Sequence, residues 1–87
     1  MTLDLILERL DQYHQRATYG AVAAALSVPQ RSLMQDRSRD HLHSWIVAKG
    51  TGEPTGYAPR QKHPELYERD HVLSTEAELI AWLRSPK

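Results

Sequence analysis

An alanine-rich run that stops at a proline is the feature that most restricts how this chain can fold. Residues Ala21–Leu26 have high helix propensity and small side chains, and Thr18 can cap a helix that contains them. The sequence Ser27-Val28-Pro29 breaks the pattern, because proline disfavours a helix interior but suits the first turn of the next helix. Two short helices with a short link predict a helix-turn-helix over about residues 19–37, whose second helix covers about 29–36.

The outer face of this second helix is the first candidate binding surface. A helix-turn-helix needs a small residue and an apolar residue where its helices cross, and Ala23 and Leu33 fit these positions. The outer face then carries side chains of the kinds that hydrogen-bond to bases and phosphates, namely Gln30, Arg31, Ser32 and Gln35. Because the same spacing occurs in proteins that bind no nucleic acid, it does not establish a function alone.

The N-terminal segment and the middle of the chain predict a further helix and a β-hairpin. Thr2 can cap a helix over about residues 3–15, in which apolar residues recur every three or four positions. The β-prone run at 44–48, the turn at 49–52 and a return strand at 55–57 predict a wing over about residues 44–57.

The C-terminal part of the chain predicts helices over about residues 64–84. His63-Pro64 can open one of them, and Thr75 with Glu78 forms a capping box for the last. Residues 1–87 are therefore expected to form a single domain, mainly α with a short β-hairpin, that is, a winged helix-turn-helix.

Composition excludes several classes of function. A chain of 87 residues builds only a modest core, so a deeply enclosed active site is not expected. It contains no cysteine and hence no disulfide, thiolate metal site or cysteine nucleophile, which fits a cytoplasmic location. No apolar run approaches the roughly 20 residues that span a bilayer, so no membrane association is expected. Neither a nucleophile elbow nor a phosphate-binding glycine-rich loop occurs, so we expect no enzyme activity and no cofactor.

A metal site is also not expected. His41 and His43 could ligate a metal ion together with Asp36 or Asp40, because imidazole and carboxylate groups suit several divalent ions. Two loop histidines without cysteine and without helical spacing are a weak signal, however.

Charge is balanced over the whole chain but not along it. Eleven basic and eleven acidic residues give a net charge of zero, so the protein has no bulk attraction for polyanions. Residues 17–62, in contrast, hold six basic and three acidic residues. The basic residues that we expect on one DNA-binding face are Arg31, Arg37, Arg39, Lys49 and Arg60.

The sequence Thr18–Ala23 resembles the DNA-binding domain of the alkylguanine-DNA alkyltransferases and of their non-enzymatic relatives, the alkyltransferase-like proteins. The family pattern has Thr-Tyr-Gly, an apolar-Ala pair, a proline at the next helix start and an arginine on that helix. Pro29 and Arg31 take the last two places. Gly56-Tyr57 and Leu66–Val72 are similar to the family's Gly-Tyr and Leu-Leu-x-x-Glu-Gly-Val stretches, so the resemblance covers roughly residues 3–73.

This resemblance implies a winged helix-turn-helix that binds the minor groove of double-stranded DNA. It implies that Tyr19 disturbs the DNA backbone and that Arg31 enters the base stack where a nucleotide is flipped out. A planar cationic side chain can occupy a vacated base position and hydrogen-bond there, which is consistent with that role.

The segment Ser44–Val47 departs from the family. Alkyltransferases have Pro-Cys-His-Arg-Val there, with the cysteine as alkyl acceptor, whereas alkyltransferase-like proteins commonly carry tryptophan in its place. This chain has Trp45 and no cysteine. The resemblance therefore implies a non-catalytic DNA-binding protein that recognises flipped or damaged bases, with a base pocket formed by Trp45, Tyr57 and Asp70.

Two alternatives stay open at this point. Trp45 lies in a β-prone run beside Ile46 and Val47, and such a tryptophan is more often a core residue than part of a ligand site. The whole domain could also be a protein-interaction module that kept the scaffold and lost the DNA surface, which the zero net charge and the acidic chain ends favour.

Overall fold

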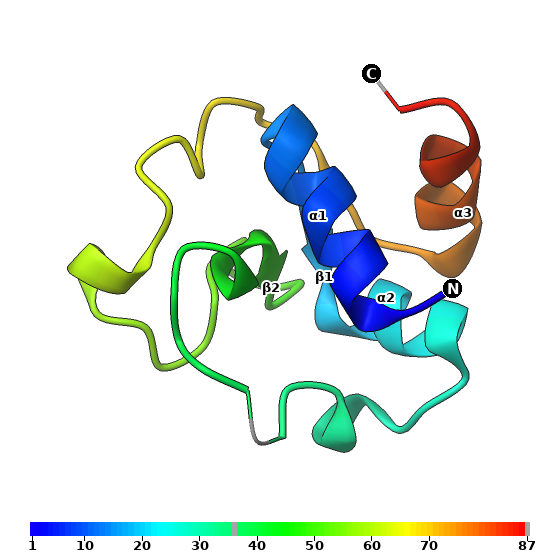
Figure 1. Ribbon diagram of the computed structural model, residues 1–87, viewed down its shortest axis with the longest axis horizontal. Helices are drawn as coiled ribbons and strands as arrows, with labels where there is room; N and C mark the ends of the chain where they lie inside the picture. Colours follow the sequence, from blue (N-terminus) through cyan, green and yellow to red (C-terminus); the bar gives the residue numbers. More distant parts are fainter. Residues whose placement is uncertain (36, 87) are drawn as a thin grey trace.

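The structure, a computed structural model, describes residues 1–35 and 37–86. Within them the chain forms a mixed α/β fold of helices and very short strands (Figure 1). The helices are α1 (Leu3–Tyr13), α2 (Tyr19–Leu26) and α3 (Glu76–Arg84), and the strands are β1 (Arg16–Thr18), β2 (Ile46–Val47) and β3 (Val72–Leu73). Three 3₁₀ turns lie in the connections, η1 (Gln30–Ser32), η2 (His43–Trp45) and η3 (Pro59–Gln61). No helix in this part of the chain is long and apolar enough to cross a bilayer.

The sheet has β1 at its centre, in the order β2-β1-β3, and both of its strand pairs are parallel. Ala17 of β1 lies opposite Ile46 on one side and Leu73 on the other. All residues of β1 and β2 are buried, which is typical of parallel strands covered on both faces. Residues that are distant in sequence therefore meet at one short central strand.

The β-hairpin predicted over residues 44–57 is wrong. The first strand forms only at Ile46–Val47, and it pairs with β1 rather than with residues 55–57. Residues 55 and 56 form a turn, and Gly56 has φ +76°. Ile46 and Val47 are both buried, so they need a partner within the core, and β1 supplies it.

Two of the predicted helices are single turns instead. The helix predicted over 29–36 is the 3₁₀ turn η1, in which the N–H groups of Ser32 and Leu33 donate to the third carbonyl before them. Its predicted end at residue 36 lies outside the described residues. The segment after His63-Pro64 makes isolated turns and leads into β3, so the C-terminal helices reduce to α3. Leu33 is nevertheless buried in the same cluster as Ala23, as expected.

The helix starts follow the predicted threonine caps. The Oγ1 atoms of Thr2, Thr18 and Thr75 accept hydrogen bonds from the backbone N–H groups of Leu5, Ala21 and Glu78, respectively. The Glu78 side chain completes the last cap by accepting from the backbone N–H of Ser74 at 3.0 Å. Thr18 ends β1 and caps α2 at once, which fixes where Tyr19 lies.

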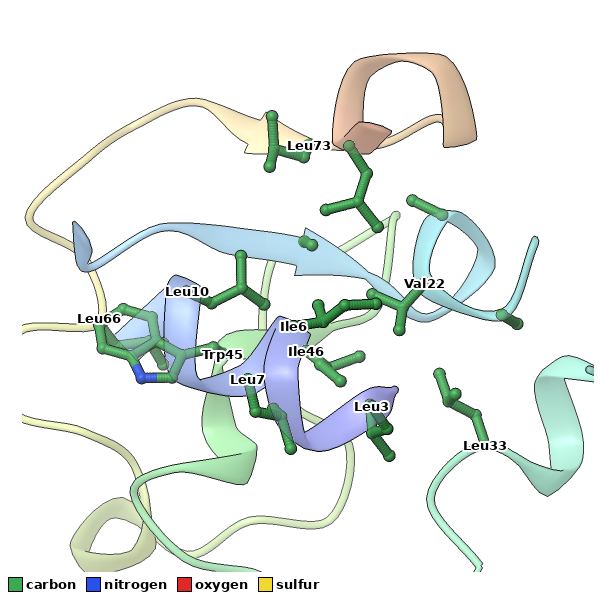
Figure 2. Packing of buried hydrophobic residues seen from close by; sticks show 14 residues of the cluster. Leu3, Ile6, Leu7, Leu10, Val22, Leu33, Trp45, Ile46, Leu66 and Leu73 are labelled. Carbon is green, nitrogen blue, oxygen red and sulfur yellow. The ribbon is translucent and has the colours of Figure 1, made fainter. Parts of the chain in front are cut away.

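The core lies between α1, the sheet and α2 (Figure 2). Its largest residue is Trp45, which has no exposed surface, and α1 contributes Leu3, Ile6, Leu7 and Leu10. The Trp45 indole N–H donates to the Asp11 carboxylate at 2.9 Å, so its one polar group is satisfied. The α3 helix adds Leu79 and packs against α2.

A buried arginine connects the sheet to two loops. Arg16 of β1 is 8% exposed, and its guanidinium donates to the carbonyl oxygens of Gly52 and Arg69, each at 2.8 Å. The same group lies 5.3 Å from the centre of the Tyr67 ring, within cation–π range. Arg16 therefore holds the segments around residues 52 and 69 against the central strand.

We predict that Arg16→Met lowers the free energy of unfolding by about 2–4 kcal/mol, because two partly buried carbonyls lose a charged donor. Arg16→Lys should recover only part of the loss, since one ammonium group cannot easily reach both carbonyls. Urea unfolding followed by circular dichroism measures both changes. The exposed Arg60 provides the control, and Arg60→Met should change stability by less than about 0.5 kcal/mol. Equal losses for Arg16→Met and Arg60→Met would contradict this role.

Candidate functional site

A cavity of about 730 Å³ lies beside the start of α2, between η1 with the chain that follows it and the turn at residues 55–57. Its lining contains three arginines and two tyrosines, and no acidic residue within the described chain. The lining residues are Tyr19, Gln30, Arg31, Met34, Arg37, Ser38, Arg39, Thr55 and Tyr57. Cationic and aromatic side chains from three separate segments thus surround one opening.

Tyr19 fixes one wall of the cavity. It is the first residue of α2 and is partly buried. Its hydroxyl oxygen accepts a hydrogen bond from the backbone N–H of Thr55 at 2.9 Å. Because Thr18 sets the helix start, this bond joins the start of α2 to the turn that carries Tyr57.

The Arg39 guanidinium lies close to Gly56, in the turn at residues 55 and 56. A Cβ atom added at Gly56 would lie 3.3 Å from both Nε and Nη2 of Arg39. Gly56 also has φ +76°, a conformation that other residues adopt only at a cost. The glycine therefore allows the turn and leaves room for the guanidinium.

The three arginines differ in how far their charge is neutralised. Arg37 forms an ion pair with Asp4 of α1, with 2.6 Å between Nη1 and Oδ1. Arg31 and Arg39 are exposed and make no ion pair with any residue that the structure describes. Two guanidinium groups thus remain available to an anionic ligand.

Tyr57 is the described lining residue whose pKa is clearly shifted. Burial raises its pKa to about 12, with a further contribution from Tyr19 and Asp40, while Arg39 acts in the opposite direction. Its hydroxyl oxygen is buried and has no hydrogen-bond partner among the described residues. A buried hydroxyl without a described partner is an uncommon feature of a folded protein.

The remaining predicted DNA-binding residues differ in whether they line the cavity. Gln30 lines the cavity, and a Cβ atom added at Gly20 would lie 3.4 Å from its Oε1 atom. Ser32, Gln35, Lys49 and Arg60 are exposed but lie outside the cavity lining.

The residues predicted to form a base pocket are not brought together. Tyr57 lines the cavity, but Trp45 is in the core, where the His14 ring stacks on it with 5.6 Å between ring centres. Asp70 is exposed and outside the lining, and its backbone carbonyl lies 3.5 Å from the Arg16 guanidinium. Trp45 thus takes the core position that its β-prone surroundings favoured.

Three of the lining residues carried no sequence signal for a binding site, namely Met34, Ser38 and Thr55. Met34 is partly buried in the turn after η1. A site formed by loops has no periodicity that would mark such residues.

In the histidine pair considered for metal binding, His43 contacts Asp40 through both its ring and its backbone N–H. The Asp40 carboxylate lies 2.6 Å from His43 Nδ1, and it also accepts the His43 backbone N–H at 3.0 Å. Burial acts to raise the pKa of Asp40, but these hydrogen bonds and the nearby histidines hold that pKa below its usual range. No group of three possible metal ligands occurs among the described residues, and Asp36 lies outside them.

Comparison with known protein families, with curated proteins and with solved structures finds no match for this chain. The geometry of the cavity and the residues that form it are therefore the basis for a proposed function.

We predict that Gly56→Ala destabilises the fold by about 1–2 kcal/mol, because alanine is strained at this positive φ and its methyl group meets the Arg39 guanidinium. Thermal unfolding measures the loss. Gly50→Ala is the matched control, since a Cβ atom at Gly50 has nothing within 4 Å, and it should leave stability almost unchanged. A similar effect of both substitutions would show that the contact between Gly56 and Arg39 is not structurally important.

Tyr57 should also make stability fall at alkaline pH. Between its unfolded pKa near 10 and its native pKa of about 12, native Tyr57 keeps a proton that the unfolded chain has lost. The free energy of unfolding therefore decreases as pH rises through this window, and Tyr57→Phe should reduce that decrease. Urea unfolding at pH 9 and pH 11 tests this. The same pH dependence in Tyr57→Phe and in the wild type would contradict the assignment.

Proposed function

We propose that this chain is a non-catalytic protein that binds double-stranded DNA at the cavity beside α2. The observation that carries the proposal is the convergence of Tyr19, Arg31, Arg39 and Tyr57 from three segments on one opening without a described acidic lining residue. Guanidinium groups match phosphate oxygens and base edges through paired N–H donors. Tyrosine rings add stacking surfaces and hydroxyl groups, so the lining offers both kinds of contact that DNA requires.

The size of the cavity supports a role beyond binding the DNA backbone. Its volume of about 730 Å³ lies within the range of roughly 300–1,000 Å³ that is typical of small-molecule sites. A nucleotide rotated out of the duplex is a ligand of this class. The partly buried Tyr57, which lines the cavity, is then the residue that meets the flipped or damaged base.

The resemblance to alkyltransferase DNA-binding domains is part of this proposal. In this proposal, α2 and η1 act as the helix-turn-helix, and the loop from residue 48 to residue 57 replaces a regular wing. The helix-turn-helix and this loop both contact the minor groove. Tyr19 at the start of α2 disturbs the backbone, and the exposed Arg31 on η1 fills the vacated base position. Trp45 has no direct part, because it is buried in the core.

Zero net charge does not oppose binding of this kind. At physiological salt, charges further away than about 8 Å are largely screened, so the ligand responds mainly to nearby groups. If Arg31, Arg37 and Arg39 neutralise two or three phosphates, the logarithm of the binding constant should fall with the logarithm of salt concentration with a slope of about −2 to −3.

We predict that Arg31→Ala weakens duplex DNA binding by about 1–3 kcal/mol, the range of a specific guanidinium contact. Arg31→Lys should lose most of the same affinity, because a stacked and bidentate role requires a planar group. Fluorescence anisotropy with a labelled duplex at two salt concentrations measures these affinities. A second duplex with 2-aminopurine at its centre reports by its fluorescence whether a base leaves the stack.

Arg9→Ala is the matched control for this experiment. Arg9 is exposed on α1 and outside the cavity, so its removal changes net charge equally and should leave DNA affinity nearly unchanged. Equal affinities for the wild type and both Arg31 variants, all folded, would contradict the proposed mode. Absence of salt-dependent DNA binding would favour the rival hypothesis, a protein-interaction module that lost the DNA surface.

A further inference from the structure

A second cavity, separate from the proposed DNA site, lies between α1 and α3. It is a groove of about 430 Å³ whose apolar lining includes Met1, Leu5, Ile80 and Leu83. Met1 is 64% exposed and Leu5 is 44% exposed, and they are two of the four large hydrophobic residues that the described chain exposes. Apolar side chains gathered in this way mark an interaction site, because isolated exposure is ordinary and clustered exposure is not.

Two arginines complete the lining of this groove, one from each helix. Arg9 of α1 and Arg84 of α3 are exposed, and neither forms an ion pair with a residue that the structure describes. No described lining residue is acidic. The groove therefore combines an apolar floor with positive charge on both of its walls.

We infer that this groove docks a protein segment that carries large apolar side chains flanked by carboxylates. Apolar side chains would cover Leu5 and Leu83, and aspartate or glutamate beside them would pair with Arg9 and Arg84. An amphipathic helix laid along a groove between two helices is a recurrent form of such recognition. DNA fits less well, because its phosphates would lie against the apolar floor without a partner.

The groove is independent of the proposed DNA site. The two cavities share no lining residue, so one chain can bind DNA and a protein segment at the same time. An acidic partner that binds at this groove does not occupy Arg31 or Arg39, because these two residues line the other cavity.

Selection from a random library of displayed 12-residue peptides tests this inference. The enriched peptides should carry apolar residues three or four positions apart, with aspartate or glutamate beside them. One synthetic enriched peptide is then measured by fluorescence anisotropy. Its affinity should fall at least about tenfold in the Arg9→Glu/Arg84→Glu variant, because attraction becomes repulsion. A peptide with lysine in place of its carboxylates should bind this variant better than the wild type.

The double variant Lys49→Glu/Arg60→Glu is the matched control, since it makes the same charge change outside both cavities and should keep peptide affinity within about twofold. The DNA proposal stays separately testable, because Arg31→Ala should weaken DNA binding by the same factor in the Arg9→Glu/Arg84→Glu background. Three results would overturn the inference: no enrichment of acidic apolar peptides, no response to the two arginines, or a dimer in light scattering that Leu5→Glu dissociates, which would assign the groove to a second copy.

Discussion

The hydrogen bonds of Arg16 hold together parts of the chain that no local signal connects. Its guanidinium reaches the carbonyl oxygens of Gly52 and Arg69 from the central strand. The loops around residues 52 and 69 also have other attachments to the core, because the Tyr19 hydroxyl accepts the Thr55 N–H and Leu66 is fully buried. The turn at 55–57 follows the first of these loops, so Arg16 contributes to the position of Tyr57 although Arg16 does not line the cavity. The shape of the site is thus set in part from within the core.

The parts of the fold that depend on neighbouring residues could be predicted from the sequence. The caps of Thr2, Thr18 and Thr75 act within three residues, and α1, α2 and α3 begin where they indicate. The sheet could not be predicted in this way, because Ala17 pairs with Ile46 and Leu73 over long separations in the chain. A run such as Ile46-Val47 indicates a strand but not its partner, and a hairpin was the nearest solution.

The site shows the same division between local and distant causes. Arg31 is exposed, as its place on the outer face of the predicted second helix indicates, and Tyr19 begins α2 directly after its Thr18 cap. Which of the other basic residues lie near them depends on the loop path, and Arg39 lines the cavity while Lys49 and Arg60 do not. Gly52 and Gly56 gave local signals for this path, since turns with positive φ favour glycine. Trp45, which the resemblance assigns to a base pocket, is buried in the core instead.

Histidines explain how a chain of zero net charge can present unpaired arginines. Within the described residues, four of the six contacts between a basic side chain and a carboxylate involve a histidine, which engages Asp11, Asp40, Glu68 or Glu78. Among the described residues, these carboxylates therefore do not pair with arginine, whereas the Asp4 carboxylate does so, through Arg37. Arg31 and Arg39 at one cavity, and Arg9 and Arg84 at the other, have no ion-pair partner among the described residues and are available to a ligand. What decides binding is which basic side chain each carboxylate meets, and the total count of charges cannot show this.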